Sequence, residues 1–157
     1  MSAGPLVPLI LLGPILAWVA VSDLRRMRIP NAASLAALAL FAACLPFAGT
    51  ADIAARTAAA GVVFALGFAL FAANLVGGGD VKILSVLVLF VPPPFWTLFA
   101  NLFAASLLLG LVAVVAMQAI PNGARSSWAV RRNRGSFPMG LSIALSGLTL
   151  PPAALLF

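Results

Sequence analysis

Two acidic residues, Asp23 and Asp80, are the side chains of this sequence that could do chemistry together. Each lies where an apolar stretch meets a polar one, and each is followed two positions later by a base, Arg25 or Lys82. Ionisable groups at the depth of a membrane are costly and usually mark function. Two neighbouring carboxylates can share one proton, so that the ionised one draws a proton from water while the other donates to a carbonyl. The pair predicts hydrolysis by two aspartates, with no metal and no cofactor.

These residues also have structural interpretations. A carboxylate at a helix end beside a cation can simply be solvated among lipid headgroups. We interpret the third acid, Asp52, structurally, because Thr50 or Asp52 can cap the following helix and Asp52 has the i,i+4 spacing of an ion pair with Arg56. The glycines at 77–79 allow close backbone approach to a substrate and conformations closed to other residues, but they are also compatible with a plain turn or an anion-binding nest.

The composition restricts the possible chemistry to these few groups. The chain has 157 residues, of which 64% are hydrophobic and only 8% charged, and its mean hydropathy is +1.18. Soluble domains carry about 25% charged residues, so a water-soluble globule is excluded. The sequence has no His, and Cys44 is its single cysteine. This excludes a Ser-His-Asp or Cys-His catalytic system, an intramolecular disulfide and a cysteine metal cluster.

The elements that must position the two aspartates are membrane-spanning segments, each of which needs about 20 apolar residues as a helix. The sequence contains six apolar stretches, at residues 5–22, 32–48, 54–76, 81–91, 95–120 and 139–157. The fourth is short and ends at three prolines, so either the bilayer is thin there or the segment is a short helix buried against its neighbours. Basic residues follow the first stretch instead of preceding it, which favours a retained span over a cleaved signal peptide. We predict an all-α, polytopic membrane helix bundle of about six transmembrane helices, forming one integral-membrane domain over residues 1–157.

The distribution of positive charge predicts the orientation of this bundle. With the N-terminus outside, eight of the nine Lys and Arg residues fall in the loops after the first, third and fifth spans, and only Arg56 lies on the opposite side. Cytoplasmic loops carry such an excess of positive charge. We therefore expect Asp23 and Asp80 at the cytoplasmic face and Asp52 at the outer one. A position beside anionic lipid explains the basic loops, so we expect lipid contacts and no nucleic-acid partner.

Three segments of the sequence carry a resemblance to a known family. Residues 23–31 (DLRRMRIPN) resemble the pattern D-x-[RK]-x-x-x-I-P-N, and residues 77–82 (GGGDVK) match G-x-G-D-x-K. Residues 137–144 (FPMGLSIA) are similar to P-[YF]-G-x-[AS]-x-A, with Met139 where an aromatic residue is usual. Two aspartate motifs in this order, each at the same end of a span, resemble the type IV prepilin peptidases, membrane aspartic proteases of the GxGD class. The resemblance extends over the whole chain.

The resemblance implies roles for individual residues. Asp23 and Asp80 become the catalytic pair. The substrate-binding or supporting groups around them would be Gly77, Gly78, Gly79, Lys82 and Arg25. The residues with structural roles near the site would be Pro30, Asn31, Pro138 and Gly140. Pro30 and Asn31 would fix and cap the turn into the second span, and Pro138 and Gly140 would let the last span pack closely. The two bases could tune the carboxylates, hold headgroups or a substrate carboxylate, or serve only as orientation charges.

The implied activity is cleavage of a prepilin or pseudopilin, which has a short basic leader, a glycine before the cut and then an apolar helix. The implied location is the bacterial inner membrane, with the active site at the cytoplasmic face. Long members of the family carry paired cysteine motifs linked to N-methylation of the product. This chain begins almost directly with a span and has no cysteine pair. It resembles the short, peptidase-only enzymes of Tad/Flp pilus systems, without methyltransferase activity; archaeal preflagellin peptidases are also short.

Two other classes of protein would use the same features differently. A small proton-coupled transporter could use Asp23 and Asp80 as a proton relay, but transporters favour acids near the bilayer midplane and internal repeats. A non-enzymatic scaffold for pilus assembly would tolerate the loss of both aspartates. The resemblance favours the peptidase over both.

Overall fold

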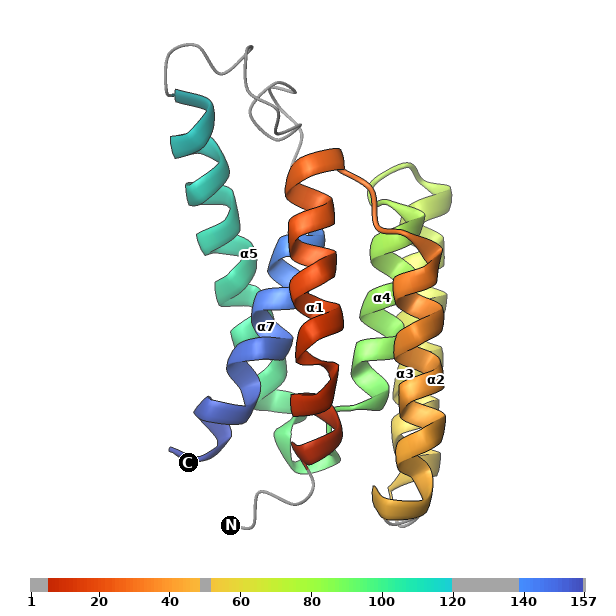
Figure 1. The fold of residues 1–157 in the computed structure, drawn as a ribbon. Coiled ribbons are helices and arrows are strands. Elements are labelled where there is room, and N and C mark those ends of the chain that lie inside the picture. The colour runs from red at the N-terminus through yellow and green to blue at the C-terminus, as the bar shows by residue number, and fades with distance from the viewer. Residues whose placement is uncertain (1–5, 49–51, 120–138, 157) are drawn as a thin grey trace.

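The computed structural model describes residues 6–48, 52–119 and 139–156 and is entirely helical in these ranges. In chain order its elements are α1 (Val7–Arg26), α2 (Asn31–Ala48), α3 (Ile53–Ala72), α4 (Gly78–Leu89), the 3-10 helix η2 (Pro93–Phe95), α5 (Trp96–Ala119) and α7 (Met139–Ala154). Successive α-helices run in alternating directions, so the end of α1, the start of α2 and the α3–α4 turn share the upper end of the bundle in Figure 1. The predicted all-α class with six helices is confirmed.

Three segments are long and apolar enough to cross a membrane by themselves, namely α1, α3 and the stretch Pro93–Ala113. The apolar parts of α2 and α7 are shorter. Many large apolar side chains, such as Phe68 on α3 and Val112 on α5, are more than half exposed. Exposed apolar surface of this extent is typical of a protein that contacts lipid. The architecture is therefore consistent with a polytopic membrane bundle.

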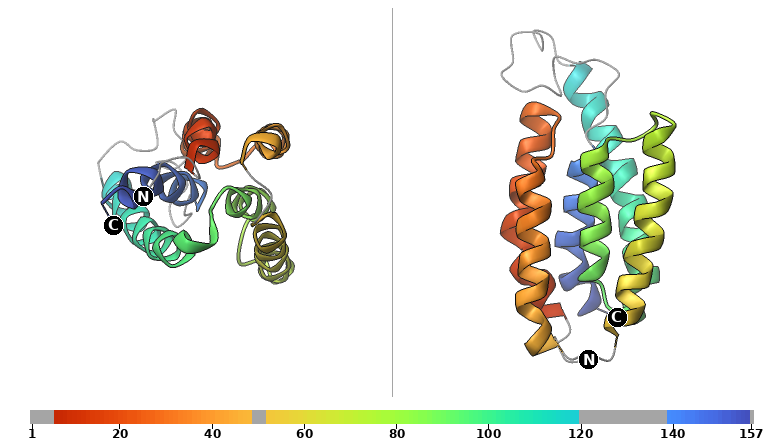
Figure 2. Two further views of the ribbon diagram at one scale, coloured as in Figure 1. Left: turned by 90° about the horizontal axis from the view of Figure 1, so that it is seen from below. Right: turned by 90° about the vertical axis from the view of Figure 1, so that its right-hand side faces the viewer.

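The short helix α4 is the centre of the bundle. It packs against α2, α3 and α7, as the view along the helices in Figure 2 shows. Its side chains Ile83 and Leu87 are completely buried, as is Phe90 just beyond its last residue. Of the two interpretations of this short stretch, the structure favours a short helix enclosed by its neighbours. The Trp96 indole N–H donates to the Val91 carbonyl oxygen at 3.1 Å and so ties the start of α5 to the end of α4.

Both aspartates lie inside helices, whereas the sequence analysis placed them just outside. Helix α1 continues through Asp23 to Arg26 and ends at Met27, whose φ of 52° is left-handed. Helix α4 begins at Gly78, so Asp80 lies in its first turn. The helix dipole favours Arg25 and Arg26 in the last turn of α1 and Asp80 in the first turn of α4, whereas it disfavours Asp23. The side chains of Asp23 and Asp80 are thus held by regular helix backbone.

The structural interpretation of Asp52 needs correction. Asp52 occupies the N-cap position of α3, but its side chain makes no capping hydrogen bond. Within the described residues it forms no ion pair with Arg56, although its charge still acts on that guanidinium. Arg56 is only 6% exposed, whereas Asp52 is exposed.

Helix α7 approaches α1 and α4 closely at Gly147. A Cβ added there would lie 2.6 Å from Leu16 Cδ1 and 3.1 Å from Leu87 Cδ1. Both leucines are completely buried, so they have little room to yield. The missing side chain of Gly147 is therefore what lets three helices meet in the core.

We expect Gly147→Val to destabilise the protein by about 1–3 kcal/mol, the usual cost of overpacking a core. The measurement is the thermal unfolding midpoint of the purified protein in detergent. Gly61→Val is the matched control, because a Cβ at Gly61 meets nothing within 4 Å. Equal midpoints for the two variants would contradict the close packing at Gly147.

Candidate active site

Asp23 lies in the last turn of α1 and is nearly buried, with 5% of its surface exposed. Its Oδ2 accepts a hydrogen bond of 3.2 Å from the backbone N–H of Leu141, 118 positions away in the sequence. Leu141 belongs to the first turn of α7, where backbone N–H groups have no partner within the helix. The carboxylate of Asp23 thus connects the end of α1 to the start of α7 and is held in one orientation.

Asp80 lies in the first turn of α4 and folds back on the glycine that precedes the helix. A Cβ added at Gly77 would lie 2.6 Å from Asp80 Oδ2. Backbone φ and ψ at Gly77 are −77° and 139°, which any residue can adopt. The glycine is therefore required for space and not for an unusual conformation, contrary to one expectation from the sequence. The other oxygen, Oδ1, is buried and has no hydrogen-bond partner among the described residues.

The structure brings the two aspartates to the same end of the bundle. The charge of Asp23 acts directly on Asp80, so the two carboxyl groups interact electrostatically. Like charges at short range disfavour double ionisation, which leads such pairs to hold one proton between them. The described residues contain no group of three or more His, Cys, Asp or Glu side chains that could hold a metal ion.

Ile29 lies against the first turns of two helices near the aspartates, α4 and α7. A Cβ added at Gly79 would lie 3.1 Å from Ile29 Cβ. One added at Gly140 would lie 2.8 Å from Ile29 Cδ1 and 2.9 Å from Asp23 Oδ2. The backbones of α4 and α7 therefore approach the α1–α2 turn closely only because both positions are glycine. The sequence analysis gave Ile29 no role, although it is part of the first aspartate motif.

The turn that carries Ile29 is itself fixed by local contacts. The Ser22 hydroxyl donates to the Arg28 carbonyl oxygen at 2.9 Å, and the Ala33 N–H donates to the Pro30 carbonyl oxygen at 2.9 Å. Pro30 thus precedes the first turn of α2, as expected for a residue that fixes this turn. Arg25 is exposed in the last turn of α1. Pro138 lies outside the described residues.

Lys82 has a hydrogen-bond partner on α2. Its ammonium donates to Asn31 Oδ1 at 3.1 Å, and both side chains are exposed. Among the described residues Lys82 makes no ion pair with Asp23 or Asp80. Asn31 is the first residue of α2, and its side-chain oxygen accepts from Lys82, a different partner from the helix backbone expected of a cap. The contact joins the starts of α2 and α4 beside the aspartates.

The third glycine of the predicted set, Gly78, has a packing role. A Cβ added there would meet the ring of Phe71 at 3.3 Å, which links the start of α4 to the last turn of α3. The sequence analysis left open that the glycines at 77–79 form a plain turn. Gly78 is instead the first residue of α4.

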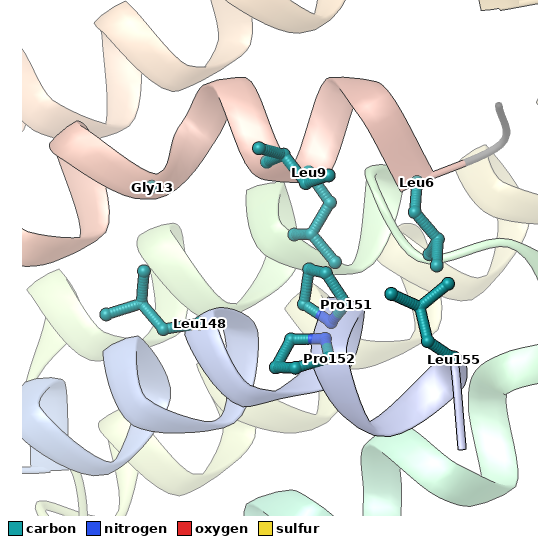
Figure 3. A pocket seen from close by; sticks show the side chains of 8 residues that line it. Leu6, Leu9, Gly13, Leu148, Pro151, Pro152 and Leu155 are labelled. Carbon is teal, nitrogen blue, oxygen red and sulfur yellow. The ribbon is translucent and has the colours of Figure 1, made fainter. Parts of the chain in front are cut away.

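Asp80 lies on the wall of a pocket of about 210 Å³ between α3, α4, α5 and the start of α7. Apart from this carboxylate the lining is apolar, with Met139, Phe103 and Val63 among its side chains. A second pocket, between α1 and α7, is lined by Leu6, Leu9, Pro151 and other residues without ionisable groups (Figure 3). This second pocket lies at the opposite end of α1 from Asp23. Of these two pockets, only the one beside Asp80 therefore combines an apolar lining with an acidic group.

A model of the type IV leader peptidase family matches residues 10–115 of the chain, a range that contains both aspartates and the glycines before Asp80. Comparison with curated proteins and with solved structures gives no significant match. The family match covers more than half of the chain and extends from α1 into α5. The chain therefore belongs to the type IV leader peptidase family, and it is an aspartic-type prepilin peptidase.

Proposed function

We propose that Asp23 and Asp80 cleave the short basic leader of a prepilin of the Tad/Flp type at the cytoplasmic face of the bacterial inner membrane. One observation carries this proposal. Two carboxyl groups from different helices lie at one end of the bundle within electrostatic reach, and Asp80 Oδ1 is buried with no hydrogen-bond partner among the described residues. Family membership supports prepilin leaders as the substrate. The positive charge in the loops at this end supports the cytoplasmic face.

The mechanism uses both carboxyl groups at once. The ionised aspartate takes a proton from a water molecule, whose oxygen attacks the carbonyl carbon of the scissile peptide. The protonated aspartate donates its proton to the carbonyl oxygen, which gives a neutral tetrahedral intermediate. Collapse of this intermediate breaks the C–N bond as the leaving nitrogen receives a proton from the aspartate that was the base. One hydroxyl of the intermediate returns its proton to the other aspartate, which restores the starting protonation of the pair. The Leu141 N–H orients Asp23 throughout, and the backbone at Gly77 fixes the position of Asp80.

The product is expected to be unmethylated. The sequence has a single cysteine, Cys44. It therefore has no cysteine pair of the kind that long, methylating members of the family carry. Cys44 lies partly buried on α2 and lines none of the pockets described above. Mass spectrometry of the processed pilin checks this directly, since N-methylation would add about 14 Da.

The proposal is tested by reconstituting the purified protein in liposomes with a purified prepilin. We expect removal of the leader after the glycine that precedes the apolar segment, detected by the mass of the product. Proton or solute flux without proteolysis would support the transporter instead. If cells whose copy of this protein lacks both Asp23 and Asp80 still remove the leader and assemble pili, the result would support the scaffold. Either result would overturn the peptidase assignment of this site.

Lys82 and Asn31 are expected to make only a small contribution to cleavage. An exposed hydrogen bond contributes about 0.5–1.5 kcal/mol, so Lys82→Met should slow cleavage by roughly two- to tenfold. Asn31→Leu should produce a similar loss, and the double variant should lose little more, because both changes remove the same contact. Initial rates of leader removal measure all three. A loss as severe as that of Asp80→Ala would show that Lys82 acts on the carboxylates after all.

A further inference from the structure

Helix α3 packs mainly against α4, as Figure 2 shows. A groove lies on each of its two sides. The α3–α5 groove consists of two adjoining pockets of about 210 and 330 Å³, which share the side chains of Val63, Leu84 and Phe103. It extends from Asp80 and Met139 at one end to Trp96 at the other. The α2–α3 groove, of about 400 Å³, contains Lys82 and Asn31 at one end and Leu38 and Phe64 along its walls.

The floor of the α3–α5 groove is one face of α4. Asp80, Leu84 and Val88 follow one another at intervals of four residues and all line it. Residues four apart lie on the same face of a helix, so this row is a straight apolar stripe that begins at the carboxylate. The distance along the axis from Asp80 to Val88 is about 12 Å, or two helical turns.

The two walls of the α3–α5 groove follow the same helical period. Ala59, Val63 and Gly67 line it from α3, again at intervals of four. Trp96, Phe99 and Phe103 line it from the start of α5 at intervals of three and four. Three helix faces thus form a channel whose only ionisable lining residue is Asp80. Its shape and chemistry fit an apolar helix that has one peptide bond to present to the carboxylate.

We propose that the α3–α5 groove binds the apolar helix that follows the scissile bond of the substrate, with that bond at Asp80 and the helix directed towards Trp96. The proposal rests on the peptidase function proposed above. It assigns the substrate to this groove because the α2–α3 groove ends at the Lys82–Asn31 contact and has no acidic lining residue. Since α3 and α5 flank the groove without extensive packing on each other, the cleaved product can leave sideways into lipid.

Position 63 offers a matched pair of probes for this proposal. Val63 faces both pockets of the α3–α5 groove, whereas its neighbour Val62 is 58% exposed and lines neither groove. V63C, V62C and L38C are made in a C44S background with Asp80→Asn, which stops turnover. Each is mixed in liposomes with a prepilin that has one cysteine in its apolar segment. We expect disulfide cross-linking to V63C to exceed that to V62C and L38C by about tenfold, because only position 63 faces the bound helix.

Cleavage provides a second readout that uses the active enzyme. V63W fills the groove and should slow prepilin cleavage by about tenfold or more, whereas V62W and L38W should leave the rate within about twofold. Equal cross-linking at 62 and 63, preferential cross-linking at 38, or unimpaired cleavage by V63W would overturn the proposal. Failure of the unmodified protein to cleave any prepilin would instead refute the proposed function. Cross-linking does not depend on turnover, so the two failures are distinguishable.

Discussion

Replacing either Asp23 or Asp80 by alanine should abolish removal of the leader from a co-expressed prepilin, whereas Asp52→Ala should leave it intact. A lone carboxylate cannot fill the acid and the base role in the same step, so each single loss is expected to be as severe as the double one. Asp52 is exposed at the start of α3, at the opposite end of that helix from the α3–α4 turn that leads to Asp80. It therefore controls for the loss of one negative charge from a chain that has only three acids.

The asparagine variants separate chemistry from structure. In Asp23→Asn the amide oxygen can still accept the hydrogen bond from Leu141, so the junction of α1 and α7 should persist. Losing one acid–base group nonetheless costs about 10²–10⁴-fold in rate. Cleavage is followed by the mobility shift of the prepilin, and folding by helical circular dichroism of the purified variants. Full processing by either asparagine variant would exclude a mechanism that needs both aspartates.

The helices of this fold were predictable because composition alone decides them. Apolar stretches of this length can satisfy their backbone in lipid only as helices, and polar or proline-containing turns separate them. The ends were less predictable. Helix α1 passes through Asp23 to Arg26, and α4 begins before Asp80. The helix dipole favours Arg25 and Arg26 in a last turn and Asp80 in a first turn, but it disfavours Asp23 where it lies. The length of α4 could be read from its prolines, but its place at the centre of the bundle could not.

The two aspartates could be singled out from the sequence because acids are rare in it and these two share one end of the spans. Composition and spacing could not reveal their surroundings, because these are made by backbone from distant segments. Only the resemblance pointed to Gly79 and Gly140 beside them. The Leu141 N–H that holds Asp23, and the contacts of Ile29 with Gly79 and Gly140, carry no signal of periodicity or charge. A supporting role of Lys82 beside the carboxylates was implied by the resemblance, with a simple orientation charge as the alternative. A residue two positions beyond Asp80 on a helix lies on a different face from it.

A single methyl group at Gly77 should remove most of the activity while leaving the fold intact. The Cβ of Gly77→Ala would lie 2.6 Å from Asp80 Oδ2, a distance that forces the carboxylate to rotate away. The backbone itself is unstrained, because φ of −77° suits alanine as well as glycine. A displacement of about 1 Å at a reacting group can cost on the order of 100-fold in rate, and we expect a loss of that size here.

The same substitution elsewhere in the chain makes the measurement decisive. Gly61→Ala meets nothing within 4 Å, and Gly78→Ala meets only the ring of Phe71 at 3.3 Å, so both should retain most of the cleavage rate. Gly140→Ala, whose Cβ would lie 2.9 Å from Asp23 Oδ2, should resemble Gly77→Ala because it displaces the other carboxylate. Initial rates on one prepilin, with thermal midpoints in detergent, compare the four variants. Wild-type rates in Gly77→Ala would mean that Asp80 does not act from the position described here.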